Sequence, residues 1–86
     1  MTDDEIKALV LRELSNIAPE IDPARIDPAV NVRDQVDLDS MNVLDLMIAI
    51  HEATGVEIPE ADYPKILTLN DFASYLRPRL KDRQTG

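Results

Sequence analysis

The sequence predicts an all-α domain with three main helices plus a short helix, arranged as a bundle with a long first loop. Three segments repeat apolar residues at the spacing of an amphipathic helix, and each begins with a residue suited to capping a helix. No stretch alternates apolar and polar residues over a useful length, as a half-buried strand would. The 86 residues suffice for one small domain, and its core must be aliphatic because the chain has only one Phe, two Tyr and no Trp.

The first helix is expected at about residues 3–16. Thr2 and Glu5 have the spacing of a capping box, in which each side chain accepts a hydrogen bond from the other residue's amide. Pro19 follows and discourages continuation of the helix. The apolar residues with helical spacing are Ile6, Leu9, Val10, Leu14 and Ile17.

Residues 18–39 are expected to form a long connection. A loop of this length in a compact domain is usually anchored or functional. In a short repeat, Asp22-Pro23 and Asp27-Pro28 can each start a helical turn, because Asp caps and Pro suits the first helical position. The apolar residues expected to pin the loop to the core are Ile21, Ile26, Val30 and Val32.

The second helix should run from Ser40 to Thr54. Asp39 is a suitable N-cap, and Gly55 is a suitable residue to end the helix. Prolines punctuate the stretch that follows, where one short helical turn is expected near residues 60–64.

The last helix opens at Thr68-Leu69-Asn70-Asp71. Pro78 is expected to end or bend it near Arg77. This gives a single domain over residues 1–80 and a polar C-terminal tail over residues 81–86. The apolar stripe of the helix consists of Leu69, Phe72, Ala73, Leu76 and Leu80.

The helix at 40–54 carries two apolar stripes. One consists of Val43, Leu46, Met47 and Ile50. The other consists of Met41, Leu44 and Ile48, and it is bordered by Asp45 and Glu52. Both stripes could belong to one wide buried face. Alternatively, the second stripe is an exposed apolar strip ringed by acids, which is typical of a protein-docking surface.

The net charge of −8 is concentrated in one central segment. Between Arg33 and Lys65 there is no Lys or Arg, and the eight acids there leave nine of the 17 elsewhere, matched by all nine Lys and Arg. Such a surface disfavours nucleic acid and anionic membranes, whereas it fits a basic patch on another protein. The simpler alternative is that acidity keeps a small protein soluble.

Neither a catalytic set nor a metal site can be assembled from the sequence. The chain has no cysteine and one histidine, His51, which lies about 16 Å along the helix from Ser40 and so cannot activate it. A calcium loop beginning at Asp37 lacks the required glycine and has Ile48 in place of the bidentate Glu. The acidic N-terminus and the lack of a long apolar run predict a cytoplasmic protein.

The run Asp37-Leu38-Asp39-Ser40-Met41-Asn42-Val43-Leu44-Asp45-Leu46 resembles the phosphopantetheine attachment site of acyl carrier proteins. The continuation Gly55-Val56-Glu57-Ile58-Pro59 resembles the same family. The likeness covers nearly the whole chain, and it includes the length, the charge and the order of the helices. It implies an acyl-carrier-like bundle that is not an enzyme.

The resemblance implies that Ser40 accepts a 4′-phosphopantetheine group from coenzyme A, transferred by a separate magnesium-dependent phosphopantetheinyl transferase. Asp39 would help the transferase to recognise the site. The arm ends in a thiol, so a protein without cysteine can carry acyl groups as thioesters. The acyl chain would fold back between the helix at 40–54 and the short turn at 60–64.

The same resemblance implies a partner face on a monomeric carrier. Its residues would be Met41, Leu44 and Ile48 as an apolar strip, with Asp45, Glu52, Glu57 and Glu60 pairing with basic residues. The partners would be acyl-activating, condensing and other acyl-transfer enzymes with basic docking patches.

Several positions differ from the family pattern. Asp37 stands where members often have Gly, and Asn42, His51 and Ala53 stand where acids are common. A role in a specialised pathway is therefore an alternative to a role in general fatty-acid synthesis. The cargo could belong to polyketide or lipid-A-type synthesis. Two alternatives are an aminoacyl, peptidyl or alanyl carrier, and an unmodified acidic helical adaptor.

Overall fold

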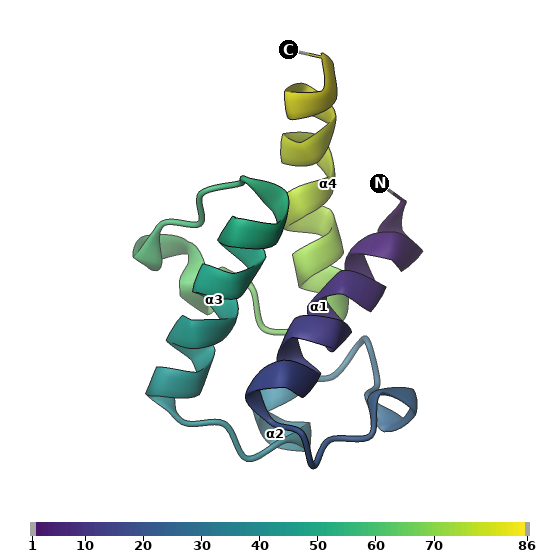
Figure 1. The fold of residues 1–86 in the computed structure, drawn as a ribbon, viewed down its shortest axis with the longest axis vertical. Coiled ribbons are helices and arrows are strands. Elements are labelled where there is room, and N and C mark those ends of the chain that lie inside the picture. Colours follow the sequence, from purple (N-terminus) through teal and green to yellow (C-terminus); the bar gives the residue numbers. More distant parts are fainter. Residues whose placement is uncertain (1, 86) are drawn as a thin grey trace.

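Three long helices form a bundle, with shorter helices in the connections between them (Figure 1). A computed structural model describes the backbone of residues 2–85 and the side chains of residues 2–80, and no strand occurs in that part of the chain. The elements are α1 (Asp3–Ile17), η1 (Pro23–Arg25), α2 (Val32–Gln35), α3 (Ser40–Thr54), η2 (Glu60–Lys65) and α4 (Leu69–Thr85), where η denotes a 3-10 helix. The predicted all-α class is confirmed. Within the same residues, no helix is long and apolar enough to cross a membrane.

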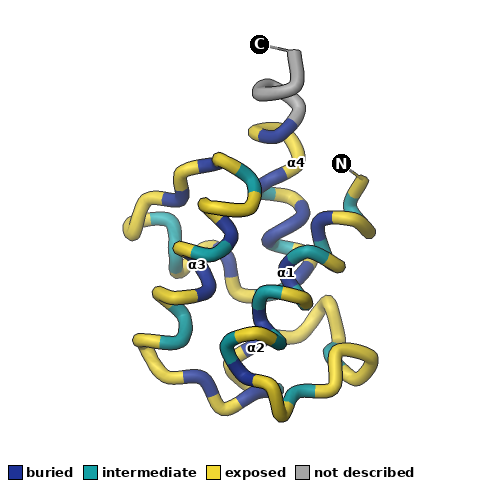
Figure 2. The backbone as a smooth tube through the Cα atoms, in the orientation of Figure 1, coloured by how far each residue is buried: buried dark blue, intermediate teal, exposed yellow. Residues whose placement is uncertain are grey.

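The core lies where α1 packs against both α3 and α4. Figure 2 shows the buried residues on the inward faces of these three helices. Because burying a large aliphatic side chain contributes about 1.5–3 kcal/mol, this shared core dominates the stability of so small a domain. The innermost side chains are Ile6, Val10 and Leu14 of α1, Leu46 and Ile50 of α3, and Leu69, Phe72 and Leu76 of α4.

The start of α1 is held by the predicted capping box. The Thr2 hydroxyl accepts from the Glu5 amide at 3.2 Å, and the Glu5 carboxylate accepts from the Thr2 amide at 2.8 Å. The hydrogen bond from the Thr2 amide holds the pKa of the Glu5 carboxyl below its ordinary value. The helix ends at Ile17, one residue later than expected.

The long connection is more ordered than the sequence suggested. The Asp22-Pro23 turn is present as η1, but the helix α2 was not expected. The Gln35 side-chain oxygen accepts from the Asp27 amide at 2.6 Å. Its nitrogen donates to the carbonyls of Asp27 and Val30, each at 2.9 Å. Two backbone hydrogen bonds, from Val32 to Leu67 at 2.9 Å and from Asn70 to Pro28 at 3.0 Å, tie the loop to the segment before α4 and to the first turn of α4.

The expected apolar anchors of this loop are only partly correct. Val32 is buried, and Ile21 and Ile26 pack half-buried against the core. Val30 is instead 39% exposed, so its assignment as an anchor is wrong. Its carbonyl, rather than its side chain, is fixed, because it accepts from Gln35.

The helix α4 does not end near Arg77, and that alternative for Pro78 is wrong. Proline removes one helical hydrogen bond and costs about 3 kcal/mol in a helix interior. Burial of Leu76 and Leu80 on either side of Pro78 favours continuation. The Arg79 guanidinium also donates to the Tyr75 carbonyl at 2.8 Å, in the turn next to Pro78. The predicted tail at 81–86 lies outside the residues whose side chains are described.

A side-chain cluster joins η2 to α4. The Tyr75 hydroxyl donates to the Asp62 carboxylate at 2.6 Å, and Lys65 lies 3.5 Å from the same carboxylate. Arg79 stacks over the Tyr75 ring at 3.6 Å from its centroid. The hydrogen bond from Tyr75 lowers the pKa of Asp62, whereas burial and that same bond raise the pKa of Tyr75.

These two shifts predict a pH window in which the hydroxyl of Tyr75 stabilises the fold. A carboxyl whose pKa is lowered on folding stabilises the folded state at pH values above its pKa in the unfolded chain, about 4. This stabilisation is lost as the pH falls through the pKa of the carboxyl in the folded state. A phenol with a raised pKa stabilises below its unfolded value, about 10, and this contribution disappears as pH rises through the folded value. The free energy of unfolding lost in Tyr75→Phe should therefore be largest between about pH 4 and pH 10.

Urea unfolding of the wild type and Tyr75→Phe from pH 2 to pH 11 measures this difference. Tyr63→Phe is the matched control, because Tyr63 is half-buried and its hydroxyl makes no hydrogen bond to the described residues. A Tyr75→Phe difference that stayed constant over the whole pH range would contradict the prediction.

Candidate functional site

Ser40 is the first residue of α3, and it is exposed. Its position depends on the preceding residue, which forms a capping box with Asn42. The Asp39 carboxylate accepts from the Asn42 amide at 2.8 Å, and the Asn42 side chain accepts from the Asp39 amide at 3.2 Å. The helix ends as expected at Gly55, which has a φ of 74° that glycine adopts without strain.

The backbone around Ser40 is suited to an anion. The amides of Ser40 and Met41 have no acceptor among the described residues, whereas the next two amides of α3 bind Asp39. Free amides and the helix dipole both favour negative charge at a helix N-terminus. The Ser40 hydroxyl likewise has no hydrogen-bond partner in the described part of the chain, and so it is open to an external reactant.

The two apolar stripes of α3 have different environments. Leu46, Met47 and Ile50 are at most 3% exposed, and Val43 is half-buried. In the second stripe, Met41, Leu44 and Ile48 are 67%, 41% and 46% exposed. The interpretation in which both stripes form one buried face is therefore wrong.

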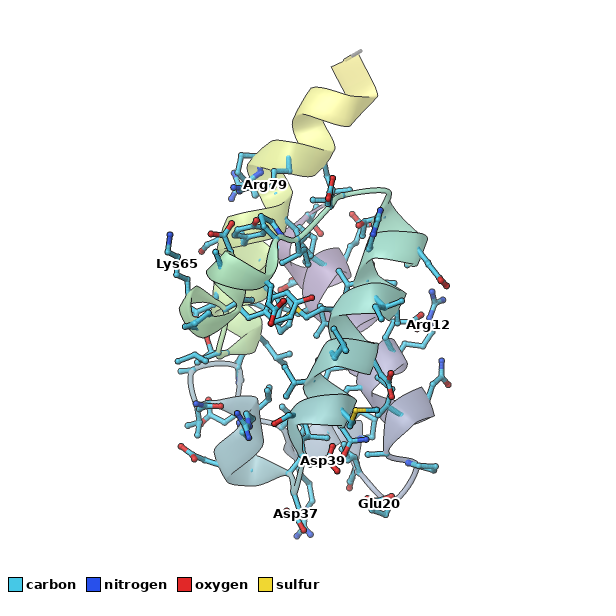
Figure 3. The ribbon with its side chains drawn as sticks, turned by 90° about the vertical axis from the view of Figure 1, so that its left-hand side faces the viewer. Arg12, Glu20, Asp37, Asp39, Lys65 and Arg79 are labelled. Atoms are coloured by element: carbon cyan, nitrogen blue, oxygen red, sulfur yellow. The ribbon has the colours of Figure 1, made fainter. Side chains whose placement is uncertain are left out.

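The acidic residues near this strip are exposed and carry charge that is not neutralised. They are Asp45, Glu52, Glu57 and Glu60. Among the described side chains, ion pairs form elsewhere, between Arg12 and Glu13, Lys65 and Asp62, and Arg77 and Asp3. In Figure 3, Asp37 and Asp39 lie together at the end of the molecule where α3 begins, away from Lys65 and Arg79. The described residues hold no cluster of three acidic or histidine side chains that could bind a metal.

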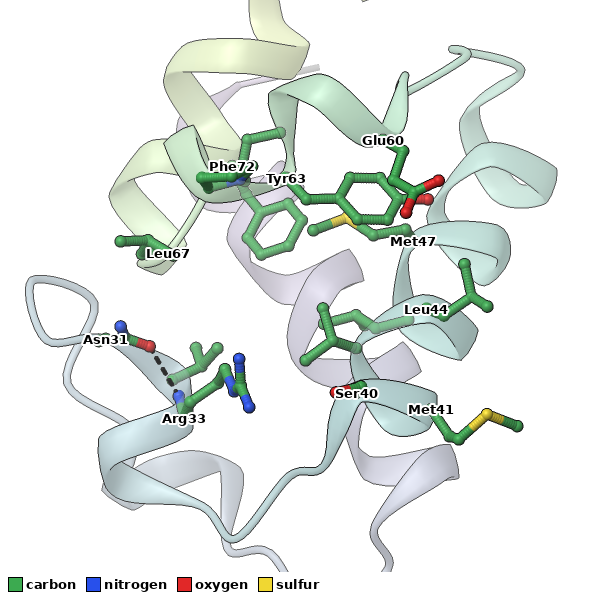
Figure 4. A pocket seen from close by; sticks show the side chains of 15 residues that line it. Asn31, Arg33, Ser40, Met41, Leu44, Met47, Glu60, Tyr63, Leu67 and Phe72 are labelled. Atoms are coloured by element: carbon green, nitrogen blue, oxygen red, sulfur yellow. Dashed lines mark hydrogen bonds between the residues drawn. The ribbon is translucent and has the colours of Figure 1, made fainter.

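A cavity of about 560 Å³ opens beside Ser40, between α3 and η2 (Figure 4). The start of α4 and the short helix α2 complete its walls. Most of its lining is apolar and includes Leu46, Met47, Tyr63, Ile66 and Phe72. This gap lies between the two elements that the sequence analysis named.

The structure brings some of the predicted site residues together and not others. Ser40, Met41, Leu44 and Glu60 all line the cavity, and Asp39 adjoins Ser40. The remaining predicted residues are outside its lining. They are Asp45, Ile48, Glu52 and Glu57.

The contribution of α2 to this cavity was not predicted from the sequence. Asn31 and Arg33 lie on its wall, and Val32, expected only as a loop anchor, lines it too. The local signal was Asn31, whose side chain accepts from the Arg33 amide at 2.9 Å and caps α2. Phe72 was expected as core, but its place in the cavity wall depends on tertiary packing.

Comparisons with known proteins agree with this geometry. The family model described as a phosphopantetheine attachment site matches residues 4–76. An acyl carrier protein from Syntrophobacter fumaroxidans is 35% identical over 84% of this chain and 91% of its own length. One from Campylobacter jejuni is 31% identical over 87% of this chain and 91% of its own.

A solved structure of an acyl carrier protein from Enterococcus faecalis has the same fold. It superposes with a TM-score of 0.72 at 26% identity, over 88% of this chain and 95% of that one. The family match, the relatives and the shared fold agree with one another. The chain therefore belongs to the acyl carrier protein family, whose members are carriers and not enzymes.

Proposed function

We propose that this protein carries acyl intermediates as thioesters on a 4′-phosphopantetheine arm attached to the Ser40 hydroxyl. The observation that supports this most directly is an exposed serine at the first position of α3, beside an apolar cavity. Its hydroxyl and the first two amides of the helix have no hydrogen-bond partner among the described residues. When attached, the arm supplies a thiol, which the chain itself lacks. We place this activity in the cytoplasm, on a monomer.

Attachment requires only a nucleophilic oxygen and an external enzyme. A bond forms between Ser40 Oγ and the phosphorus that bears the pantetheine. The phosphoanhydride bond of coenzyme A breaks, adenosine 3′,5′-bisphosphate leaves, and the serine proton passes to a base of the transferase. His51 cannot act as the base, because it is about 16 Å further along α3. The neighbouring Asp39 carboxylate is bound to the Asn42 amide as the helix cap.

The N-terminus of α3 suits the charge of the product. A phosphodiester on Ser40 would lie beside the amides of Ser40 and Met41, where an anion gains typically about 0.3–1 kcal/mol. The Asp39 carboxylate caps the helix through one oxygen, and the residue is exposed. We propose that a basic group of the transferase recognises it there.

We propose that partner enzymes dock on the strip formed by Met41, Leu44 and Ile48. An exposed apolar strip beside acidic side chains provides a small desolvated contact within a charged rim. The rim would consist of Asp45, Glu52, Glu57 and Glu60, which form no ion pair with the described residues. Phosphopantetheinyl transferase and acyl-activating, condensing and other acyl-transfer enzymes with basic patches are the partners that this surface fits.

The cavity beside Ser40 is proposed to shelter the acyl chain. Each methylene that leaves water for apolar walls contributes about 0.8 kcal/mol, so an alkyl chain would gain more than a small polar group. The apolar lining therefore favours acyl cargo over the aminoacyl alternative. Fatty-acid, polyketide and related specialised lipid synthesis all supply such cargo.

The first test is modification of Ser40. Incubation with coenzyme A, magnesium and a promiscuous transferase should raise the intact mass by one phosphopantetheine. Ser40→Ala should stay folded and gain no mass, whereas Ser74→Ala, an exposed serine on α4, should be modified like the wild type. Modification of Ser40→Ala, or none of the wild type, would support the unmodified adaptor instead.

The second test separates docking from folding on α3. Leu44→Ala should cost little stability because Leu44 is already 41% exposed, yet it should slow modification because apolar contacts dominate small interfaces. Leu46→Ala removes a side chain that is 1% exposed and should cost about 2–5 kcal/mol. Urea unfolding and transferase kinetics measure the two effects. Equal losses of stability in the two variants would rule out an exposed docking strip.

The third test concerns the acidic rim. Asp45→Lys should lower the rate of association with a basic partner about tenfold at low salt, and the defect should shrink as salt screens the charges. Asp4→Lys changes the net charge equally but lies in the first turn of α1, at the other end of the bundle (Figure 1). Stopped-flow association rates over a salt series measure both. Equal defects in the two variants would show that only net charge matters.

A further inference from the structure

Arg33 occupies an unusual place in the cavity beside Ser40. It is the only cationic residue in the lining, and Glu60 is the only anionic one. Arg33 lies on α2, whereas Glu60 is the first residue of η2. Figure 4 shows the guanidinium of Arg33 extending from α2 into the space in front of Ser40, with Glu60 on the opposite rim.

The Arg33 guanidinium has no interaction partner in the described part of the chain. Its backbone amide is bound by Asn31, but its side chain makes no ion pair and no hydrogen bond with the described residues. The two arginines of α4 whose side chains are described differ in this respect. Arg77 pairs with Asp3 at 3.3 Å, and Arg79 binds the Tyr75 carbonyl.

The positions of Arg33 and Glu60 on opposite sides of the cavity favour a particular kind of ligand. A guanidinium presents a planar fork of donors that binds a carboxylate in two parallel hydrogen bonds. The wall between the rims is formed by apolar side chains such as Leu46, Met47 and Phe72. Glu60 repels an anion from the other rim. A chain with an apolar middle and an anionic end therefore fits in one orientation only.

We propose that Arg33 is a specificity-determining residue that favours acyl cargo ending in a carboxylate. This inference rests on the proposed function, because the cargo reaches the cavity only when tethered through Ser40. The carboxylate would bind the Arg33 guanidinium while the methylenes lie against the apolar wall. A methyl-ended chain of equal length would gain the apolar contact but leave Arg33 unpaired.

A second anion could reach Arg33, namely the phosphodiester on Ser40 itself. The experiment therefore compares three forms, loaded by a transferase from coenzyme A, octanoyl-coenzyme A and the monothioester of octanedioic acid with coenzyme A. Each is prepared with the wild type, Arg33→Met and Arg25→Met. Arg25 is an exposed arginine of η1 that does not line the cavity, so its variant controls for the loss of one charge.

Nuclear magnetic resonance shifts of the cavity methyl groups measure how much cargo occupies the cavity, and thermal unfolding gives a second readout. In Arg33→Met, the population of the bound octanedioyl chain should fall about tenfold relative to the unbound chain, because one charge-assisted contact is lost. The octanoyl form should be unchanged or more strongly bound. Arg25→Met should behave like the wild type in all three forms.

Three results would overturn the proposal. Equal losses for the octanoyl and octanedioyl forms would show that Arg33 only packs against the chain. A difference already present in the form that carries the arm alone would assign Arg33 to the phosphodiester. Absence of loading, read from the intact mass before any binding measurement, would remove Ser40 as the acceptor and with it the proposed function.

Discussion

The packing of one face of α3 against α1 determines what the rest of the molecule can offer to partners. Leu46 and Ile50 are drawn into the core, so the helix cannot rotate without exposing them. Leu44 and Ile48 must then face outward, since at 100° per residue they lie on another side of the helix. The same constraint leaves the N-terminus of α3, with Ser40 and its free amides, at the surface.

A second constraint acts through the long connection, which carries α2 to the cavity. Backbone hydrogen bonds from Val32 to Leu67 and from Asn70 to Pro28 fasten it to the segment before α4 and to the first turn of α4. Gln35 closes the loop by binding the backbone of Asp27 and Val30. Without these bonds the connection could not hold Arg33 opposite Glu60.

Sequence reasoning succeeded where the determinants are local and failed where they are not. The caps at Thr2 and Asp39 and the stop at Gly55 involve residues within four positions of one another, so spacing alone reveals them. The helix α2 has one local signal, the Asn31 cap, but its position also depends on the backbone hydrogen bond from Val32 to Leu67, 35 positions away, which no local pattern contains. Pro78 was misjudged for the same reason, because the burial of Leu80 outweighs a local rule. Arg33 lies on α2, so its place in the cavity wall could not be predicted either.

The rim acids and Arg33 act over different distances, and this allows opposite charges to serve one site. Fields of exposed acids extend about 8 Å at physiological salt, so they influence a partner before contact. A guanidinium discriminates only at hydrogen-bond distance, where its fork geometry matters. The segment between Arg33 and Lys65 holds eight acids and no Lys or Arg, so an anionic cargo gains little from the overall field. In our proposal, a carboxylate-ended chain is therefore held by direct contact with Arg33, and that contact selects the cargo and not the partner enzyme.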